Sequence, residues 1–349
     1  MACNIKFECI KEPECSINAI SIDSLFELYD RCGFLYPAKK QRLLPYFSEI
    51  KDNWYKASAS KDSILSILSK ENRTLQKTAS LVAWRSSMNS MAAQHLSSDG
   101  MPLLTRSILL GALLYFSSYS AGLWYNPQNK YSDRLFGKLP TVVGNKYAHS
   151  ILFDYLFINA SKLSNATNKS HIRQLFNKDH KEAFHLVKTF IGDVFAKVEE
   201  FDKDDLELNE LDKLYNKSGL SRKRYFFALY SKNNQPLGIA IVYKGPLGIN
   251  FSFLKNASIV LVRDDIDKKL IEATMNNLLL TIAPVYKDFA LNTIPVLTNK
   301  TCSQLLVKNG HTFFREYKKV MWSKEINTKC YDYIDNIYGK IITRINRIS

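Results

Sequence analysis

Two titratable side chains in the first half of the chain have types and neighbours suited to proton transfer. His95 lies in the segment QHLSSDG, and the ordinary pKa of an imidazole is close enough to neutrality for it to act as a base. Tyr125 lies further along, and its phenol could act as an acid. The alternative for both is a place in the core, with the His hydrogen-bonded to a neighbour and the Tyr hydroxyl at the rim. We take His95 and Tyr125 as candidate catalytic residues.

Aromatic and amide side chains gather around Tyr125 in the segment WYNPQNKY, residues 124–131. A strand end of this composition is a usual place for ligands in α/β folds, although a capped turn with two Asn and a Pro is the alternative. Asn129 also begins a pattern that occurs twice, in residues 129–139 and 299–311. Each copy has Asn, then Leu six residues on, an apolar residue next, and Lys nine residues on.

Composition and charge indicate a globular protein with a basic surface. The 349 residues are 46% hydrophobic, which allows two ordinary domains, and the formal net charge is +15. The excess is spread over both halves, which argues against a basic tail. Such a surface could meet nucleic acid, an anionic membrane or an acidic protein.

Neither a metal site nor a membrane span is predicted. The six cysteines form no CxxC pair and have no companion His at metal-finger spacing. The uncharged segment 107–129 is interrupted by Ser, Gly, Asn and Pro, so we expect a buried helix to about Ser118 and a buried strand near Leu123. The N-terminal residues lack the apolar core of a signal peptide, and we expect a cytoplasmic protein with free thiols.

Hydrophobic periodicity predicts the same order of elements in both halves of the chain. Each half reads as helix, helix, three strands, helix, strand, the helix that carries the Asn-to-Lys pattern, and final strand, with residues 141–157 as the last strand segment of the first half. A stretch rich in Asn, Ser and Lys separates the halves. The Asn-to-Lys pattern occurs twice, at the same place in a repeated order of helices and strands. The sequence therefore predicts a duplicated α/β unit.

This order and the Asn-to-Lys pattern resemble the GNAT superfamily of N-acyltransferases, whose motif is roughly N-x-x-A-x-x-L-Y-x-K-x-G-F. The matching positions are Asn129, Ser132, Leu135, Phe136, Lys138 and Pro140, and Asn299, Cys302, Leu305, Leu306, Lys308, Gly310 and His311. The resemblance implies an α/β fold of the α+β type, with two GNAT-like units in tandem, each a mixed, mostly antiparallel sheet flanked by helices. The predicted boundaries are 1–160 and 173–326 for the units, 161–172 for a linker, and 327–349 for a C-terminal amphipathic helix.

The resemblance also implies a loop that holds the pyrophosphate of coenzyme A at a helix N-terminus, usually Q/R-x-x-G-x-G/A. In the first half its candidate donor-binding residues are Gln94, Ser97, Ser98, Gly100 and Arg106, joined by Asn129. Asp99 is an unfavourable charge in this loop, and the glycine spacing of the family is not met.

The second half departs further from the family pattern. Its corresponding junction carries Asp264, Asp265 and Asp267, which would cap a helix but repel a pyrophosphate. The Tyr that often protonates the leaving thiolate in the family is replaced by Phe136 in one half and by Leu306 in the other. We therefore expect donor binding in the first half and a degenerate second half.

The resemblance predicts transfer of an acyl group from acyl-CoA, or from the phosphopantetheine of an acyl carrier protein, to a small-molecule or peptide amine, with no metal. Carrier proteins are acidic, which suits a basic surface. One alternative is Fem-type transfer from aminoacyl-tRNA, and another is a non-catalytic GNAT-like binding or regulatory module. The apolar stripe in 331–348 could contact a membrane or a partner, or dock back onto a domain, as we expect.

Overall fold

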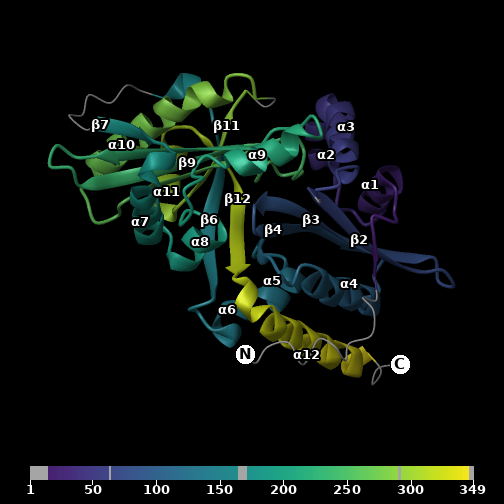
Figure 1. Ribbon diagram of the computed structural model, residues 1–349. Helices are drawn as coiled ribbons and strands as arrows, with labels where there is room; N and C mark the ends of the chain where they lie inside the picture. The colour runs from purple at the N-terminus through teal and green to yellow at the C-terminus, as the bar shows by residue number, and fades with distance from the viewer. Residues whose placement is uncertain (1–14, 63, 164–170, 290–291, 346–349) are drawn as a thin grey trace.

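The computed structural model describes residues 15–62, 64–163, 171–289 and 292–345 (Figure 1). The first half forms β1 (Ser16–Ile17), α1 (Ile22–Arg31), α2 (Pro37–Leu43), α3 (Phe47–Ser58), β2 (Leu65–Asn72), β3 (Lys77–Ser87), β4 (Ser90–Ser98), α4 (Pro102–Tyr115), β5 (Ser120–Tyr125), α5 (Lys130–Phe136), α6 (Leu139–Val143) and β6 (Ala148–Ile158). The second half forms β7 (His171–Leu175), α7 (His180–Phe190), α8 (Asp193–Val198), α9 (Asn209–Asn216), β8 (Lys223–Tyr230), β9 (Pro236–Lys244), β10 (Ser258–Val262), α10 (Lys268–Ile282), β11 (Ile294–Thr298), α11 (Lys300–Lys308), β12 (Thr312–Trp322) and α12 (Asn327–Ile345). Short 3₁₀ turns occur at Leu44–Tyr46, Ala160–Lys162, Asn177–Asp179, Ala283–Tyr286 and Lys324–Ile326.

The described strands form one mixed sheet, in the order β1-β2-β3-β4-β5-β12-β6-β11-β10-β9-β8-β7. The pairs β4–β5 and β10–β11 are parallel, and the other pairs are antiparallel. Each parallel pair is joined through one helix, α4 or α10, and is followed by the helix that carries the Asn-to-Lys pattern. The predicted fold class, two similar α/β units in tandem, is confirmed.

The last strands of the two halves are interleaved at the centre of the sheet. β12, from the end of the chain, lies between β5 and β6, and β6 in turn pairs with β11 of the second half. The predicted domain boundaries stay a prediction, because the sheet runs through both halves and the proposed linker lies mostly outside the described residues.

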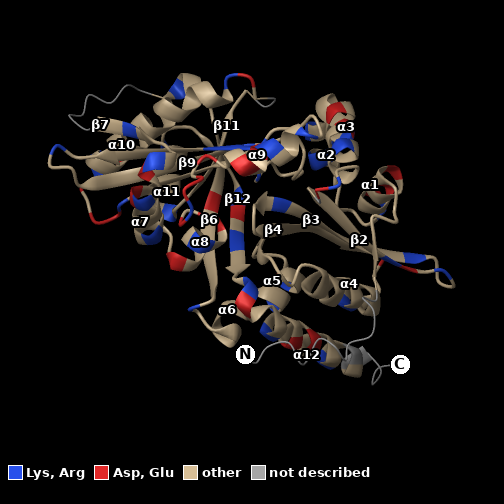
Figure 2. Ribbon diagram, viewed as in Figure 1, with Lys and Arg blue, Asp and Glu red and all other residues tan. Residues whose placement is uncertain are grey.

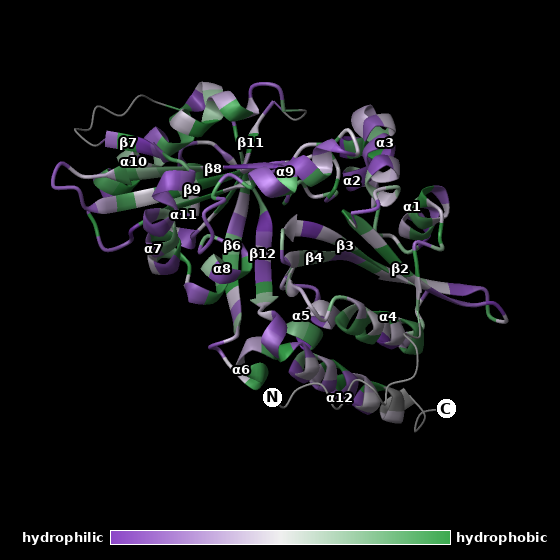
Figure 3. Cartoon of the chain, in the orientation of Figure 1, coloured by the Kyte–Doolittle hydropathy of each residue, from purple (hydrophilic) through white to green (hydrophobic). Residues whose placement is uncertain are grey.

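Helices cover both faces of the sheet. In the first half, α1 and α3 pack on one face, while α4 packs on the other and lies beside α12 (Figure 1). Figure 3 shows hydrophobic residues along much of α4, whose residues from Ser107 onward belong to the uncharged segment that the sequence predicts as a buried helix. No helix in the described ranges is long and apolar enough to cross a membrane. The covering by α12 explains why a largely apolar helix can exist inside this fold.

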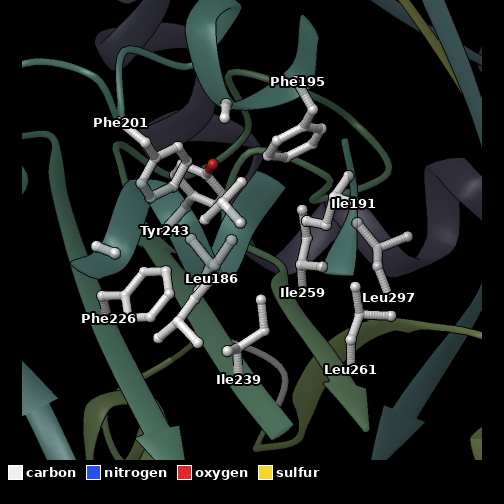
Figure 4. Close-up of a cluster of buried hydrophobic side chains, with 14 of the residues drawn as sticks. Leu186, Ile191, Phe195, Phe201, Phe226, Ile239, Tyr243, Ile259, Leu261 and Leu297 are labelled. Carbon is white, nitrogen blue, oxygen red and sulfur yellow. The ribbon is translucent and has the colours of Figure 1, made fainter. Parts of the chain in front are cut away.

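The second half is covered in the same way. Leu186, Phe195 and other side chains of α7 and α8 pack on strands β8 to β11, as Figure 4 shows for the cluster that includes Phe226, Ile239 and Ile259. On the opposite face, α10 packs against β9 and β10. Lys and Arg residues occur on helices and strands of both halves, as the even charge distribution predicts (Figure 2).

One strand prediction is wrong at its start. Residues 141–143 belong to the short helix α6, and the strand β6 begins only at Ala148. Pro140 stands in the first turn of α6, where its fixed φ favours a helix and its missing N–H costs nothing. Gly144 follows with a φ of 110°, a conformation that ends the helix and turns the chain.

Candidate active site

The parallel strands β4 and β5 separate part of the way along their length. They pair from Ser90 with Ser120 to Ala93 with Leu123, and β4 then continues to pair with β3 alone as far as Ser98. The edge of β4 that faces β5 beyond Ala93 therefore has no strand partner among the described residues. Free backbone N–H and C=O groups along such an edge can bind an extended ligand as an added strand would.

A β-bulge at His95 shapes this edge. Four residues of β4, from Gln94 to Ser97, lie opposite only three residues of β3, from Ser80 to Val82, and His95 has a φ of 56°. The bulge turns the imidazole into an aromatic cluster, where it stacks on Phe251 at 4.6 Å and on Trp54 at 5.5 Å between ring centroids. Burial holds the pKa of His95 well below its usual value, so its ring is neutral. Nδ1 has no hydrogen-bond partner in the described part of the chain.

Gln94 joins the two halves of the protein. Its Nε2 donates to the carbonyl of Ile249 at 2.6 Å, and its Oε1 accepts from Nδ2 of Asn250 at 3.0 Å. Both partners lie between β9 and β10, in a loop that inserts into the core beneath α1 and α3. Gln94 is therefore buried and already satisfied, facing the inserted loop.

Tyr125, at the end of β5, is also engaged. Its hydroxyl donates to Oδ1 of Asp133 at 2.9 Å, on the first turn of α5. Burial and the neighbouring carboxylate of Asp133 raise the pKa of Tyr125. The structure places Tyr125 and His95 in the wall of the same cavity.

The duplicated Asn is an N-cap in both halves. Oδ1 of Asn129 accepts from the backbone N–H of Tyr131 and Ser132 at 3.1 and 3.2 Å, and Oδ1 of Asn299 accepts from that of Cys302 at 2.9 Å. The Leu and apolar residues of the pattern, Leu135, Phe136, Leu305 and Leu306, are buried. Gly310 ends α11 with a φ of 81°, as the pattern predicts. The repeated pattern thus fixes a helix against the sheet in each half.

A surface pocket of about 440 Å³ lies at the start of α4. Its lining includes Ser97, Ser98, Gly100 and Asn129, and the helix begins after Met101 without a side-chain cap. Oγ of Ser97 is paired with Oγ of Ser80 at 3.0 Å, whereas Oγ of Ser98 has no partner in the described ranges. Backbone N–H groups at such an uncapped start, together with the helix dipole, attract an anion.

Asp99 is directed away from this pocket. Its carboxylate accepts two hydrogen bonds of 3.0 Å from Arg31 and one from the N–H of Thr78. The Arg31 guanidinium beside it lowers the pKa of Asp99. The charge that looks unfavourable in the sequence is therefore neutralised by a residue of α1.

Arg106 does not reach the pocket either. It lies one turn into α4 and is paired with Asp335 of α12, with Nε and Oδ1 2.6 Å apart. The structure thus brings Ser97, Ser98, Gly100 and Asn129 together around one pocket, and places Arg106 elsewhere.

The corresponding junction in the second half is closed. Asp267 caps α10 by accepting from the N–H of Lys269 at 2.8 Å, and Asp265 pairs with Arg263. Oγ1 of Thr298 donates to the carbonyl of Val260 at 2.6 Å, which ties β11 to β10 beyond their last paired residues. A second bond, from Nδ2 of Asn299 to the carbonyl of Val262 at 3.4 Å, continues this bridge.

A cavity of about 280 Å³ begins at the separation of β4 and β5 in the first half. At its polar end lie residues from both halves, with Lys39, Asn250, Arg315 and Tyr317 among them, and no Asp or Glu lines it in the described chain. Lys39 is buried, and burial together with the nearby Arg315 and Arg42 lowers its pKa to about 8. None of these residues was predicted from the sequence, where the basic run around Lys39 was the single signal for them.

No protein-family model and no curated protein sequence matches this chain. Solved structures that resemble it include a tandem GNAT protein from the clavulanic acid biosynthesis pathway, at 9% identity over 78% of this chain and 88% of that one, with a TM-score of 0.38. Others are N-myristoyltransferase from Saccharomyces cerevisiae (13% identity, 90% and 79% coverage, TM-score 0.37) and a GNAT-family acetyltransferase from Colwellia psychrerythraea (8%, 81% and 96%, 0.33). Scores this low say nothing of what this chain binds or catalyses. The repeated order of elements and the separated parallel strands identify its fold as two GNAT-like units in tandem.

Proposed function

We propose that the protein is an N-acyltransferase that binds a coenzyme A thioester in its first half. The observation that carries this proposal is the contrast between the two β–α junctions. In the first half, strands β4 and β5 are open and α4 starts without a cap. In the second half, Thr298 bridges the strands and Asp267 caps α10. Only the open junction offers both a free strand edge and free helix N–H groups to a ligand.

The pocket, the free strand edge and the cavity of the open junction follow one another in the same order as the pyrophosphate, the pantetheine arm and the thioester of an acyl-CoA. The pocket at Gly100 suits the pyrophosphate, and it adjoins the cavity through Leu96 and Asn129, which line both. The free edge of β4 suits the amide-containing pantetheine arm, which can pair with it as a strand. The thioester carbonyl then lies at the mouth of the cavity.

In the proposed reaction the amine nitrogen attacks the thioester carbonyl carbon. A C–N bond forms, the C–S bond breaks, and the proton lost by the amine ends on the leaving thiolate. Lys39 is our candidate to carry that proton, because its pKa of about 8 lets it both accept and donate near neutral pH. His95 and Tyr125 remain proposed site residues, because they are neutral groups that line the cavity and can orient the reactants.

The remaining proposed donor-binding residues divide by their contacts. Ser97, Ser98, Gly100 and Asn129 would surround the phosphates directly. Gln94 and Arg106 are held by Ile249 and by Asp335, so we assign them the positioning of β4 and α4.

The positive charge of the site and of the whole chain indicates which acceptor and which donor we propose. Lys39 and Arg315 at the cavity mouth favour a small or peptide amine that also carries an anionic group. An acyl carrier protein is a second possible source of the thioester, because the net charge of +15 would attract an acidic protein. The phosphopantetheine arm is common to both donors.

Ligand-induced stabilisation tests the proposal. A ligand that binds only the native state raises the melting temperature, by an amount that grows with its concentration above Kd. We expect coenzyme A and acyl-CoA to raise it for the wild-type protein, and Gly100→Asp to abolish the shift because it adds a negative charge at the phosphate pocket. Gly100→Asn, of the same size and equally tolerant of a positive φ, should keep more of the shift.

Asp265→Asn, in the second half, should leave the coenzyme response unchanged. Equal losses at Gly100 and Asp265 would show that the donor site is assigned to the wrong half. No shift with coenzyme A, acyl-CoA or an acylated carrier protein would overturn the proposal, and a shift with aminoacyl-tRNA alone would favour Fem-type transfer.

A non-catalytic binding module is the second candidate. It is favoured by Phe136 and Leu306, which replace the family's Tyr with buried apolar side chains in both halves. Coenzyme binding without any release of free thiol from acyl-CoA, across a panel of amines, would support this candidate over the enzyme.

A further inference from the structure

We propose that the cavity behind the β4–β5 gap holds a medium-length apolar acyl chain, so that the donor is a fatty acyl thioester rather than an acetyl one. This inference rests on the proposed function, because it names the group carried by the thioester. The cavity extends from the polar mouth at Lys39 and Arg315 to the space between the sheet and helices α4 and α12. A chain attached to a thioester at the gap would enter it directly.

Small side chains keep this space open. β3, β4, α4 and β5 each contribute one alanine to the wall, namely Ala83, Ala93, Ala112 and Ala121. Larger apolar residues surround them, with Leu109, Phe116 and Trp322 among the lining residues. Protein interiors are normally packed to crystal density, and an unfilled apolar cavity costs stability. An apolar ligand would recover that packing.

In the second half, described residues fill the corresponding space between the sheet and its helix. There α10 packs so closely on β9 that a Cβ atom at Gly238 would lie 3.0 Å from Cδ1 of Leu278 and 2.8 Å from the carbonyl oxygen of Leu261. The face between β9, β10 and α10 is filled by buried Leu, Ile and Met side chains. The space is therefore not a general consequence of the fold, and it occurs in the half that has the open strand gap.

The polar side chain at the inner end of the cavity is already hydrogen-bonded within the protein. This side chain is the amide of Asn327, at the start of α12, and its Nδ2 donates to the carbonyls of Ser117 and Tyr119 at 2.9 and 3.1 Å. Oδ1 of Asn327 accepts from Nε1 of Trp322 at 2.8 Å. Cys330 and Ile334 of α12 complete this end. A hydrocarbon chain fits such a lining, whereas a charged or sugar-like group would lose its hydration there.

The volume limits the length of the chain. A cavity of about 150 Å³ lined by Leu, Ile and Phe accommodates benzene, so a cavity of about 280 Å³ holds on the order of ten carbon atoms. Because the polar mouth takes part of this volume, we expect the best chain to have roughly eight to ten carbons.

Calorimetric titration of the full chain with coenzyme A and with acetyl-, hexanoyl-, decanoyl- and hexadecanoyl-CoA tests the inference. Burial of each added methylene should tighten binding by about fourfold until the cavity is full near ten carbons. Equal affinity for acetyl-CoA and decanoyl-CoA would overturn the inference and leave the proposed function standing.

Two substitutions on α4 should move the optimum in opposite directions. Ala112→Phe fills the cavity and should weaken decanoyl-CoA binding at least tenfold while acetyl-CoA binding is kept. Leu113→Ala enlarges it and should shift the optimum to a longer chain. Ala59→Phe, on an exposed residue at the end of α3, is the matched control and should change neither. A uniform loss for all chain lengths in both α4 variants would contradict an acyl site.

Free decanoate separates this inference from the proposed function. If decanoate binds the wild type and not Ala112→Phe while coenzyme A does not bind at all, the apolar site is supported and the coenzyme site is overturned. If coenzyme A binds but neither decanoate nor decanoyl-CoA gains from its chain, the apolar site is overturned alone.

Discussion

Lys39 carries a buried ammonium group at the mouth of the cavity. Its Nζ donates to the carbonyl of Phe34 at 3.0 Å and lies 4.0 Å from the centre of the Phe34 ring, and no carboxylate pairs with it in the described ranges. A lysine in the unfolded chain has a pKa near 10.5, whereas burial lowers that of Lys39 to about 8. A buried cation that costs stability at neutral pH is typical of a functional residue.

Replacing Lys39 by Met should reveal this cost. Between pH 8 and 10.5 the unfolded chain binds the extra proton, so this residue makes the free energy of unfolding rise with pH in that window. We expect Lys39→Met to lose that rise and to be no less stable than wild type at pH 7. Urea unfolding at several pH values measures both, and an unchanged pH dependence would contradict the assignment.

The same variant should lose acyl transfer if Lys39 moves the proton. Lys39→Arg is the matched control, because it keeps the positive charge but does not deprotonate in this range. We expect both variants to lose the limb of the pH–rate profile near pH 8 and to keep coenzyme binding. Full activity in Lys39→Arg would show that only the charge is needed.

Several residue roles could be predicted from the sequence, and others could not. The Asn at positions 129 and 299 follows a local pattern, and both side chains cap the helix that starts beside them. The surroundings of His95 depend on Phe251, which is 156 residues away in the chain. Asp99 depends in the same way on Arg31. Local spacing carries no information about such partners.

At the scale of elements, α12 is held mainly by its apolar side. Ile334 and Tyr338 are buried against α4 and its neighbours, with Ile337 and Ile341 partly buried beside them, so the described part of this stripe docks onto the protein, whereas Ile348 lies outside the described residues. The ion pair of Arg106 with Asp335 is partly exposed, at 29% and 40% for the two side chains. Exposed ion pairs typically contribute less than about 1 kcal/mol, whereas buried aliphatic side chains contribute about 2–5 kcal/mol.

Substitutions on α12 should separate these two contributions. We expect Ile334→Ala to lower the free energy of unfolding by about 2–4 kcal/mol and Asp335→Asn by less than about 1 kcal/mol. Urea unfolding at neutral pH and moderate salt measures the difference. Equal effects would mean that the helix is held by its charges and that the packing on α4 is weak.

At the scale of the whole molecule, the repeated order of elements was accessible from periodicity, but the way the halves join was not. Periodicity predicts that a strand exists and which face is apolar, and it does not say which strand will be its neighbour. The position of β12 between β5 and β6 follows from pairing across more than 150 residues of chain. The loop between β9 and β10, which covers His95, is equally remote from its partners.

This interleaving should make the two halves unfold together. Phe251 belongs to the second half, yet its ring lies 5.4 Å from those of Phe26 and Trp54 in the first. Phe226, by contrast, has its aromatic neighbour in its own half, with its ring 5.9 Å from that of Phe201 (Figure 4). Large buried aromatic side chains contribute about 3–5 kcal/mol each, so both Phe251→Ala and Phe226→Ala should be strongly destabilising.

If the halves form one cooperative unit, each variant should shift a single transition. Tryptophan fluorescence, which reports in part on Trp54 and Trp84 in the first core, should then coincide with far-ultraviolet circular dichroism of the whole chain. Independent halves would instead give two transitions. In that case Phe226→Ala would shift only the transition of the second half, and the fluorescence of the first core would stay unchanged. Because β12 cannot leave β5 without exposing the centre of the sheet, we expect one transition. Trp322 of β12 lines the proposed acyl site, so we also expect that site to persist only while both halves are folded.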